Sequence, residues 1–133
     1  MDRLFLDANV LFSAAYKSDT RLLQFWKLKD VVLCRSRYAL EEARINFENE
    51  DQRMRLTNLS SSLQLFEGTR RALSRGISLP DKDMPILFAA IDANATHLLT
   101  GDVRHFGPYF GKKIQGIKVV LPGDYLRDRN GER

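Results

Sequence analysis

The sequence predicts an α/β protein in which helices cover both faces of a parallel sheet. Short apolar runs of strand length alternate with segments of helical spacing along the 133 residues. This alternation places successive strands parallel to one another and packs the intervening helices against the sheet. No repeat, low-complexity tract or linker divides the chain, so we expect a single domain over residues 1–133.

The first part of the chain contains two apolar runs of strand length, each associated with a helical segment. The β-branched run VVLC has the composition of a buried parallel strand. Ser18 or Asp19 is in position to cap the second helix. In chain order we expect a strand at 3–7, a helix at 8–18, a second helix at 20–29 and a strand at 31–34.

The rest of the chain continues the alternation. Ser36 is in position to cap the next helix, and the apolar pairs Ile86 with Ala90 and Leu87 with Ile91 mark one buried helix face. We expect a charged helix at 37–50, a polar helix at 51–61, a short strand at 63–66, a helix at 83–95, and strands at 97–100 and 117–121.

The composition indicates a soluble globular protein of a reducing compartment. Hydrophobic residues make up 44% of the chain and charged residues 29%, which excludes a disordered class. Cys34 is the only cysteine, which excludes an internal disulfide and makes a structural zinc site improbable. No leader-like start or apolar run of about 18 residues occurs, so we expect a cytoplasmic protein without a membrane partner.

Several carboxylates follow apolar strands, where an unpaired charge is unexpected. Asp7 ends the first strand, and Asp102 follows the strand at 97–100 after one tight turn. Ligands of open parallel sheets bind beyond the carboxyl ends of the strands, and both aspartates should lie at that edge. Each could instead be a helix N-cap or turn residue. The same alternative applies to Asp83, which precedes the helix at 83–95.

Two adjacent glutamates lie on the charged helix at 37–50. Glu42 falls somewhat nearer than Glu41 to the apolar face of that helix, although either could face solvent. Acids from two strand ends and two helices can share one pocket only if a cation offsets their repulsion. Mg²⁺ prefers such oxygen ligands, and two ions about 4 Å apart can activate a water and stabilise the leaving oxygen of a phosphodiester.

Four blocks of the sequence resemble the successive signatures of PIN-domain nucleases. They are LFLDANVLFSA, SRYALEEA, DMPILFAAIDANATHLLTGD and RHFG, and together they span about residues 3–125. The resemblance implies a three-layer α/β/α sandwich with a short parallel sheet. It also implies a ribonuclease dependent on one or two Mg²⁺ or Mn²⁺ ions, as in the VapC-like toxins of this family.

The resemblance also assigns roles to individual residues. The metal-binding and catalytic positions of the family match Asp7, Glu42, Asp83 and Asp102. The polar positions that support those ligands match Asn9 and Thr100. Glu41 remains the alternative to Glu42, because the two residues are adjacent.

Basic residues suggest where RNA would bind. The chain carries a net charge of +4, and it has two stretches that contain basic residues and no acid. Phosphate contacts supply affinity without sequence information. The candidates for RNA contact are Arg70, Arg71, Arg75, Arg104, His105, Lys112 and Lys113.

The resemblance further implies protein partners. Small PIN proteins are very often the toxin of a toxin–antitoxin pair, which implies a homodimer and an antitoxin that places an arginine or lysine in the acidic pocket. Two other functions stay open. One is a PIN-like module that binds RNA or protein without cleavage. The other is a phosphatase of the haloacid dehalogenase type, against which Asn9 argues, because those enzymes need an aspartate at that position.

Overall fold

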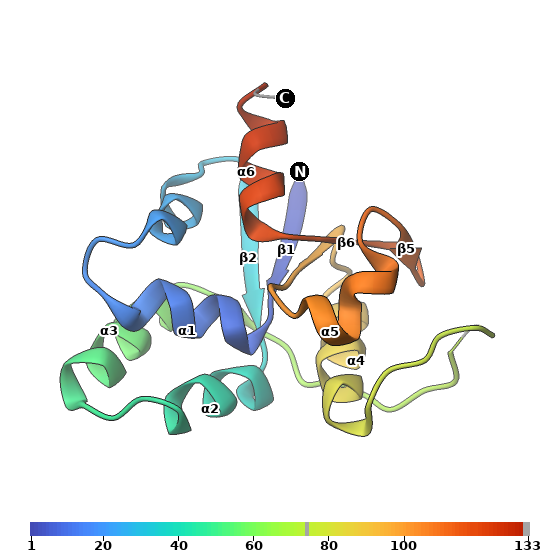
Figure 1. Ribbon diagram of the computed structural model, residues 1–133, viewed down its shortest axis with the longest axis horizontal. Coiled ribbons are helices and arrows are strands. Elements are labelled where there is room, and N and C mark those ends of the chain that lie inside the picture. The colour runs from blue at the N-terminus through green and yellow to red at the C-terminus, as the bar shows by residue number, and fades with distance from the viewer. Residues whose placement is uncertain (74, 132–133) are drawn as a thin grey trace.

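The computed structural model describes residues 1–73 and 75–131. These residues form a six-stranded sheet with the strand order β3-β2-β1-β4-β6-β5 (Figure 1). The strands are β1 (Asp2–Leu6), β2 (Val31–Arg35), β3 (Gln64–Leu65), β4 (His97–Leu99), β5 (Lys113–Ile114) and β6 (Ile117–Val120). All neighbouring strands pair in parallel except β5 and β6, which pair antiparallel. The predicted parallel sheet is therefore confirmed, with one short antiparallel strand added at its edge.

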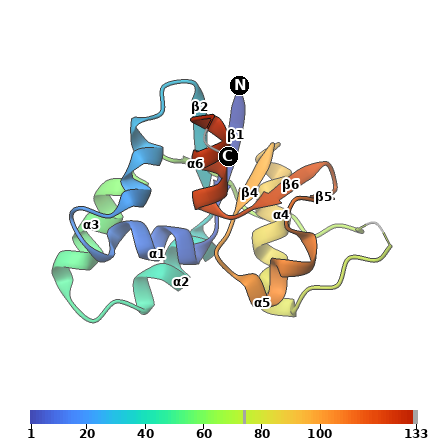
Figure 2. The same cartoon turned by 45° about the horizontal axis from the view of Figure 1, so that its top comes forward.

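Helices cover both faces of the sheet, which confirms the expected α/β/α sandwich. The α-helices are α1 (Ala8–Tyr16), α2 (Arg37–Ile45), α3 (Glu50–Ser60), α4 (Met84–Asp92), α5 (Val103–Phe106) and α6 (Pro122–Arg129). The 3₁₀ helices are η1 (Arg21–Lys27), η2 (Asp81–Asp83) and η3 (Gly107–Tyr109). Figure 2 shows α1, α2 and α3 grouped on one side of the view, with α4 and α5 on the other.

The sheet reverses its direction of growth between β1 and β4. From β1 the chain moves outward through β2 and β3 on one side, and β4 and β6 extend the sheet on the other. Leu6 pairs with Leu99, and the Asp7 amide continues this pairing by donating to the Leu99 carbonyl at 3.1 Å. Asp7 and Thr100 therefore leave neighbouring strands at the same level. This is the position where open α/β sheets bind ligands.

Burial on both faces explains the apolar run in the second half of β1. Leu4, Phe5 and Leu6 of β1 are fully buried because helices cover both faces of the sheet. Phe25 and Phe106 are also fully buried, so both aromatic residues belong to the core. Over the described ranges, no helix has both the length and the apolar character needed to cross a membrane.

The structure corrects the expected helix at 37–50. Ser36 caps α2 as predicted, since its Oγ accepts a hydrogen bond from the Ala39 amide at 3.1 Å. The helix ends at Ile45, however, and α3 begins after Asn49. The Asn46 side chain donates to the Glu42 carbonyl at 2.7 Å, and a helix-terminal carbonyl is satisfied in this way. The prediction of a helix through residue 50 was wrong because it did not foresee that Asn46 ends the helix.

Other boundaries also differ from the predictions. The segment at 20–29 contains the 3₁₀ helix η1, whose N-cap is Thr20, so the prediction of Ser18 or Asp19 as its cap was wrong. The helix predicted at 83–95 ends at Asp92, and Asn94 follows in the left-handed region at φ 52°. The short strand predicted at 63–66 is confirmed as β3. The sequence analysis missed the elements η2, α5, η3, β5 and α6.

Candidate active site

The four acids selected from the sequence line one cavity of about 560 Å³. Asp7 directly follows β1, and Asp102 comes three residues after the last residue of β4. Both aspartates therefore reach the cavity from the edge of the sheet. Glu42 reaches it from α2, and Asp83 from the start of α4. Residues far apart in the sequence thus form one acidic pocket at the reversal point of the sheet.

Asp7 is buried, with an exposure of 5%, and both of its carboxylate oxygens accept hydrogen bonds. Oδ1 accepts from the Ala8 amide at 2.7 Å, which makes Asp7 the N-cap of α1. Oδ2 accepts from Thr100 Oγ1 at 2.8 Å and from Asn9 Nδ2 at 3.1 Å. The predicted N-cap role and a place in the acidic pocket are therefore compatible.

Burial nevertheless raises the pKa of Asp7 from 3.8 to about 6. Loss of hydration is the largest cause, and the nearby carboxylates of Asp83 and Glu42 add to it. Hydrogen bonds from Thr100 and the Ala8 amide act in the opposite direction. The pocket therefore disfavours a negative charge at Asp7 even though that charge is well hydrogen-bonded.

Asp83 is buried to a similar degree but is supported differently. Its exposure is 8%, and it precedes α4 without a side-chain capping bond. Within residues 1–73 and 75–131, its Oδ2 is the one buried side-chain nitrogen or oxygen without a hydrogen bond. Burial is the largest cause that raises its pKa, and His105 partly opposes this effect. A buried carboxylate oxygen without a donor is costly unless a cation approaches it.

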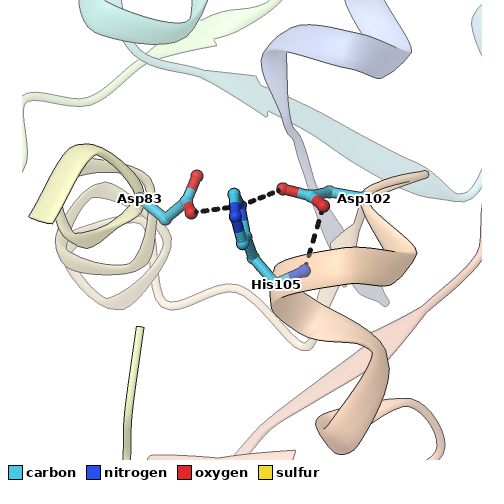
Figure 3. A group of neighbouring side chains, drawn as sticks. All are labelled: Asp83, Asp102 and His105. Carbon is cyan, nitrogen blue, oxygen red and sulfur yellow. Dashed lines mark hydrogen bonds and ion pairs between the residues drawn. The ribbon is translucent and has the colours of Figure 1, made fainter. Parts of the chain in front are cut away.

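Figure 3 shows the His105 ring between the carboxylates of Asp83 and Asp102. Nδ1 of His105 lies 2.9 Å from Asp83 Oδ2 and 2.9 Å from Asp102 Oδ2. Asp102 also caps α5, because its Oδ1 accepts from the His105 amide at 3.1 Å. His105 was expected to contact RNA, and the structure places its ring between two carboxylates that line the acidic cavity.

The two glutamates of α2 face different surroundings. Glu42 is half-buried and lines the cavity, whereas Glu41 is exposed and forms an ion pair with Arg44 at 2.5 Å. Tyr38, one helical turn before Glu42, donates its hydroxyl to the Lys82 carbonyl at 2.7 Å. This bond ties α2 to the residue beside Asp83. The geometry therefore favours Glu42 over Glu41 as the pocket residue.

Asn9 and Thr100, which the resemblance assigned to supporting positions, hydrogen-bond to Asp7 and to each other. Asn9 donates to Thr100 Oγ1 at 3.2 Å, and its Oδ1 accepts from the Gly101 amide at 2.7 Å. Thr100 Oγ1 also accepts from the Asp102 amide at 3.1 Å. A Cβ at Gly101 would lie 3.3 Å from Asn9 Oδ1, so the turn approaches Asn9 closely. These bonds connect the ends of β1 and β4.

The basic residues selected from the sequence do not share one environment. Arg71 forms an ion pair with Asp92 at the end of α4. Arg70 lines a separate depression beside α4. Exposed positions are found for Arg75, Arg104, Lys112 and Lys113.

Two functional candidates were missed or misplaced by sequence reasoning. Lys82 lines the acidic cavity and was not considered. The place of His105 could have been inferred from its spacing, since Asp102 and His105 share one turn of α5. That signal depended on recognising the short helix α5.

Comparison with known proteins supports the fold. No protein-family model matches the chain, and no curated protein matches it by sequence. Solved structures do match the chain. The crystal structure of VapBC2 from Rickettsia felis, bound to a DNA fragment from their promoter, contains a chain that matches with a TM-score of 0.63 at 18% identity. The match covers 90% of this chain and 98% of that one. The chain has a PIN-like fold.

Two further structures give the same result. VapBC-1 from nontypeable Haemophilus influenzae matches with a TM-score of 0.57 at 15% identity, covering 91% of this chain and 98% of that one. FitAcB from Neisseria gonorrhoeae matches with a TM-score of 0.52 at 16% identity, covering 90% and 98% respectively. The PIN-like fold expected from the sequence blocks is therefore confirmed along nearly the whole chain.

Proposed function

We propose that this protein is a ribonuclease that depends on a divalent cation. The observation that carries the proposal is the acidic pocket itself, in which Asp83 Oδ2 is buried without a hydrogen bond. Burial also raises the pKa of Asp7 to about 6. Both features are expected of carboxylates arranged for a cation, because positive charge would offset the repulsion and the lost hydration.

The residues present fit Mg²⁺ or Mn²⁺. Asp7, Glu42, Asp83 and Asp102 offer carboxylate oxygens around one cavity, and both ions accept such ligands. When bound, one or two such ions supply the charge that activates a water and stabilises the leaving oxygen of a phosphodiester. This cavity provides room for water and a phosphate group beside the acids.

The protein's own groups hold this arrangement in place. Thr100 and Asn9 fix the orientation of the Asp7 carboxylate through hydrogen bonds to Oδ2. Tyr38 joins α2 to the segment that carries Asp83, which limits the separation of Glu42 and Asp83. Preorganisation of this kind avoids rearrangement when the substrate binds.

Exposed basic residues would guide the RNA backbone toward the pocket. Arg104 is exposed on α5, the same helix that carries His105, and Lys112 and Lys113 are exposed near β5. Arg70 and Arg75 belong to the segment at 66–80, while Arg71 is engaged with Asp92 and would contribute less. Phosphate contacts from such residues supply affinity independent of sequence.

We further propose that the protein is the toxin of a toxin–antitoxin pair in the cytoplasm. The support is its likeness to chains in the VapBC2, VapBC-1 and FitAcB structures, the first of which is bound to DNA. A cognate antitoxin and a homodimer are the partners this proposal expects. An arginine or lysine from the antitoxin would complement the acidic pocket.

Cleavage of a labelled single-stranded RNA tests the ribonuclease proposal. We expect cleavage with Mn²⁺, none with excess EDTA, and a loss of at least about a hundredfold in Asp7→Asn, which removes a metal-binding charge. The matched control is Asp19→Asn, an exposed aspartate outside the cavity, which should cleave like the wild type. Cleavage that persists in EDTA, or that Asp7→Asn leaves intact, would overturn the proposal.

A further inference from the structure

The geometry around His105 differs from that of an ordinary histidine–carboxylate pair. Its Nδ1 is equally close, at 2.9 Å, to one oxygen of Asp83 and one of Asp102. A ring nitrogen carries at most one hydrogen in any protonation state of the imidazole. It can therefore satisfy only one of the two oxygens. The hydrogen-bond geometry favours Asp102, so Asp83 Oδ2 lies at ion-pair distance from Nδ1 but has no hydrogen bond.

The unpartnered oxygen points to a cation rather than to a hydrogen bond. Asp83 has an exposure of only 8%, so water does not freely replace the missing donor. Its Oδ2 is directed at the same ring nitrogen as Asp102 Oδ2 (Figure 3). One metal ion could bind the two carboxylate oxygens and the ring nitrogen at once, whereas one proton cannot bridge all three.

The distances also suit a shared ion. Asp83, Asp102 and His105 each offer one ligand atom, and these atoms lie within 4.8 Å of one another. Adjacent ligands around an octahedral ion at about 2.1 Å are separated by about 3.0 Å. The two separations of 2.9 Å are close to that value. Only small movements would be needed to receive an ion.

The local fold holds the histidine ring in this place. Asp102 caps α5 through Oδ1, which accepts from the His105 amide, and its Oδ2 remains available on the side of the ring. Both residues therefore belong to the same helical turn. The His105 side chain is mostly buried, at 20% exposure, which further restricts the ring.

We propose that His105 is a nitrogen ligand of the metal site, bound through Nδ1 beside Asp83 and Asp102. This inference rests on the proposed metal-dependent function and adds a preference among metals. Mg²⁺ favours oxygen ligands, whereas an imidazole ligand favours first-row transition ions. The site therefore selects Mn²⁺ over Mg²⁺ more strongly than four carboxylates alone would.

Pulsed electron paramagnetic resonance of the Mn²⁺-loaded wild-type protein tests the ligand directly. We expect a coupling from a directly bound nitrogen, and we expect it to change when histidine is labelled with ¹⁵N. The coupling should persist in His97→Gln, the matched control, because His97 begins β4 and lines a different cavity, where its ring contacts Tyr125. It should disappear in His105→Asn, which can offer an oxygen instead.

Calorimetric titration of the same proteins tests the preference. We expect His105→Ala to bind Mn²⁺ at least about tenfold more weakly and to lose less affinity for Mg²⁺. The inference would be overturned if His105→Ala kept the wild-type ratio of Mn²⁺ to Mg²⁺ affinity. It would also be overturned if the Mn²⁺-loaded wild-type protein showed no nitrogen coupling, and this second result does not depend on whether a variant folds. If cleavage still required a metal in that case, the proposed function would stand. If Mn²⁺ failed to bind or to support cleavage, both would fail.

Discussion

The two buried aspartates of the pocket, Asp7 and Asp83, are supported in opposite ways. Asp7 accepts hydrogen bonds at both oxygens, from Ala8, Asn9 and Thr100. Asp83 has a similar burial but leaves Oδ2 without a donor. Burial raises the pKa of both carboxyl groups. The comparison teaches that the protein itself supplies the partners of Asp7, whereas at Asp83 our proposal assigns that role to a cation.

The largest effect that this comparison predicts is a pH dependence of the free energy of unfolding, measured on the metal-free protein. The native state keeps a proton on Asp7 up to about pH 6, whereas its ordinary pKa is 3.8. Between these values the native state binds more protons than the unfolded state, so the free energy of unfolding falls as pH rises. The full contribution is about 3 kcal/mol.

Urea unfolding in EDTA at pH 4 and pH 7.5 measures most of this loss. Asp7→Asn should lose less stability than the wild type over that interval, because it lacks the shifted carboxyl group. A residual slope from Asp83, whose pKa is also raised, should remain in the variant. Parallel losses in the two proteins would contradict the assignment of the slope to Asp7.

A smaller effect is expected from removing the hydroxyl that supports Asp7. Thr100→Val keeps the side-chain shape but removes the donor to Asp7 Oδ2 and the acceptor for the Asp102 amide. We expect a loss of about 2 kcal/mol in the free energy of unfolding, because buried polar groups lose partners. Thr100→Ser keeps the hydroxyl and should lose about 1 kcal/mol for the missing methyl group. A valine variant as stable as the serine variant would show that these bonds do not support the pocket.

The central sheet and its edge residues were predictable from the sequence. The apolar runs at 3–7, 31–34 and 97–100 identified neighbouring strands, because buried parallel strands are apolar on both faces. The strand-end rule then placed Asp7 and Asp102 together. The same reasoning could not place Asp83 or Glu42, since the edge at which a helix begins depends on the connections. Those two assignments came from the resemblance to PIN-domain nucleases.

The remaining differences arise where tertiary contacts outweigh local pattern. The stop of α2 depends on Asn46 bonding back to the Glu42 carbonyl, and η1 forms where a longer α-helix was expected. The helix α5 has only four residues, too few for a periodic signal. His105 was therefore assigned to RNA contact, and its position between two carboxylates emerged only in three dimensions.

The most direct test of the account is whether Mn²⁺ stabilises the protein through Asp83. Thermal or urea unfolding is measured with and without Mn²⁺, for the wild type and Asp83→Asn. At a free concentration of ten times the dissociation constant, we expect a gain of about 1.4 kcal/mol for the wild type. Asp83→Asn should show almost none at that concentration. No stabilisation of the wild type, or an equal gain in Asp83→Asn, would contradict the claim that this pocket binds a divalent cation.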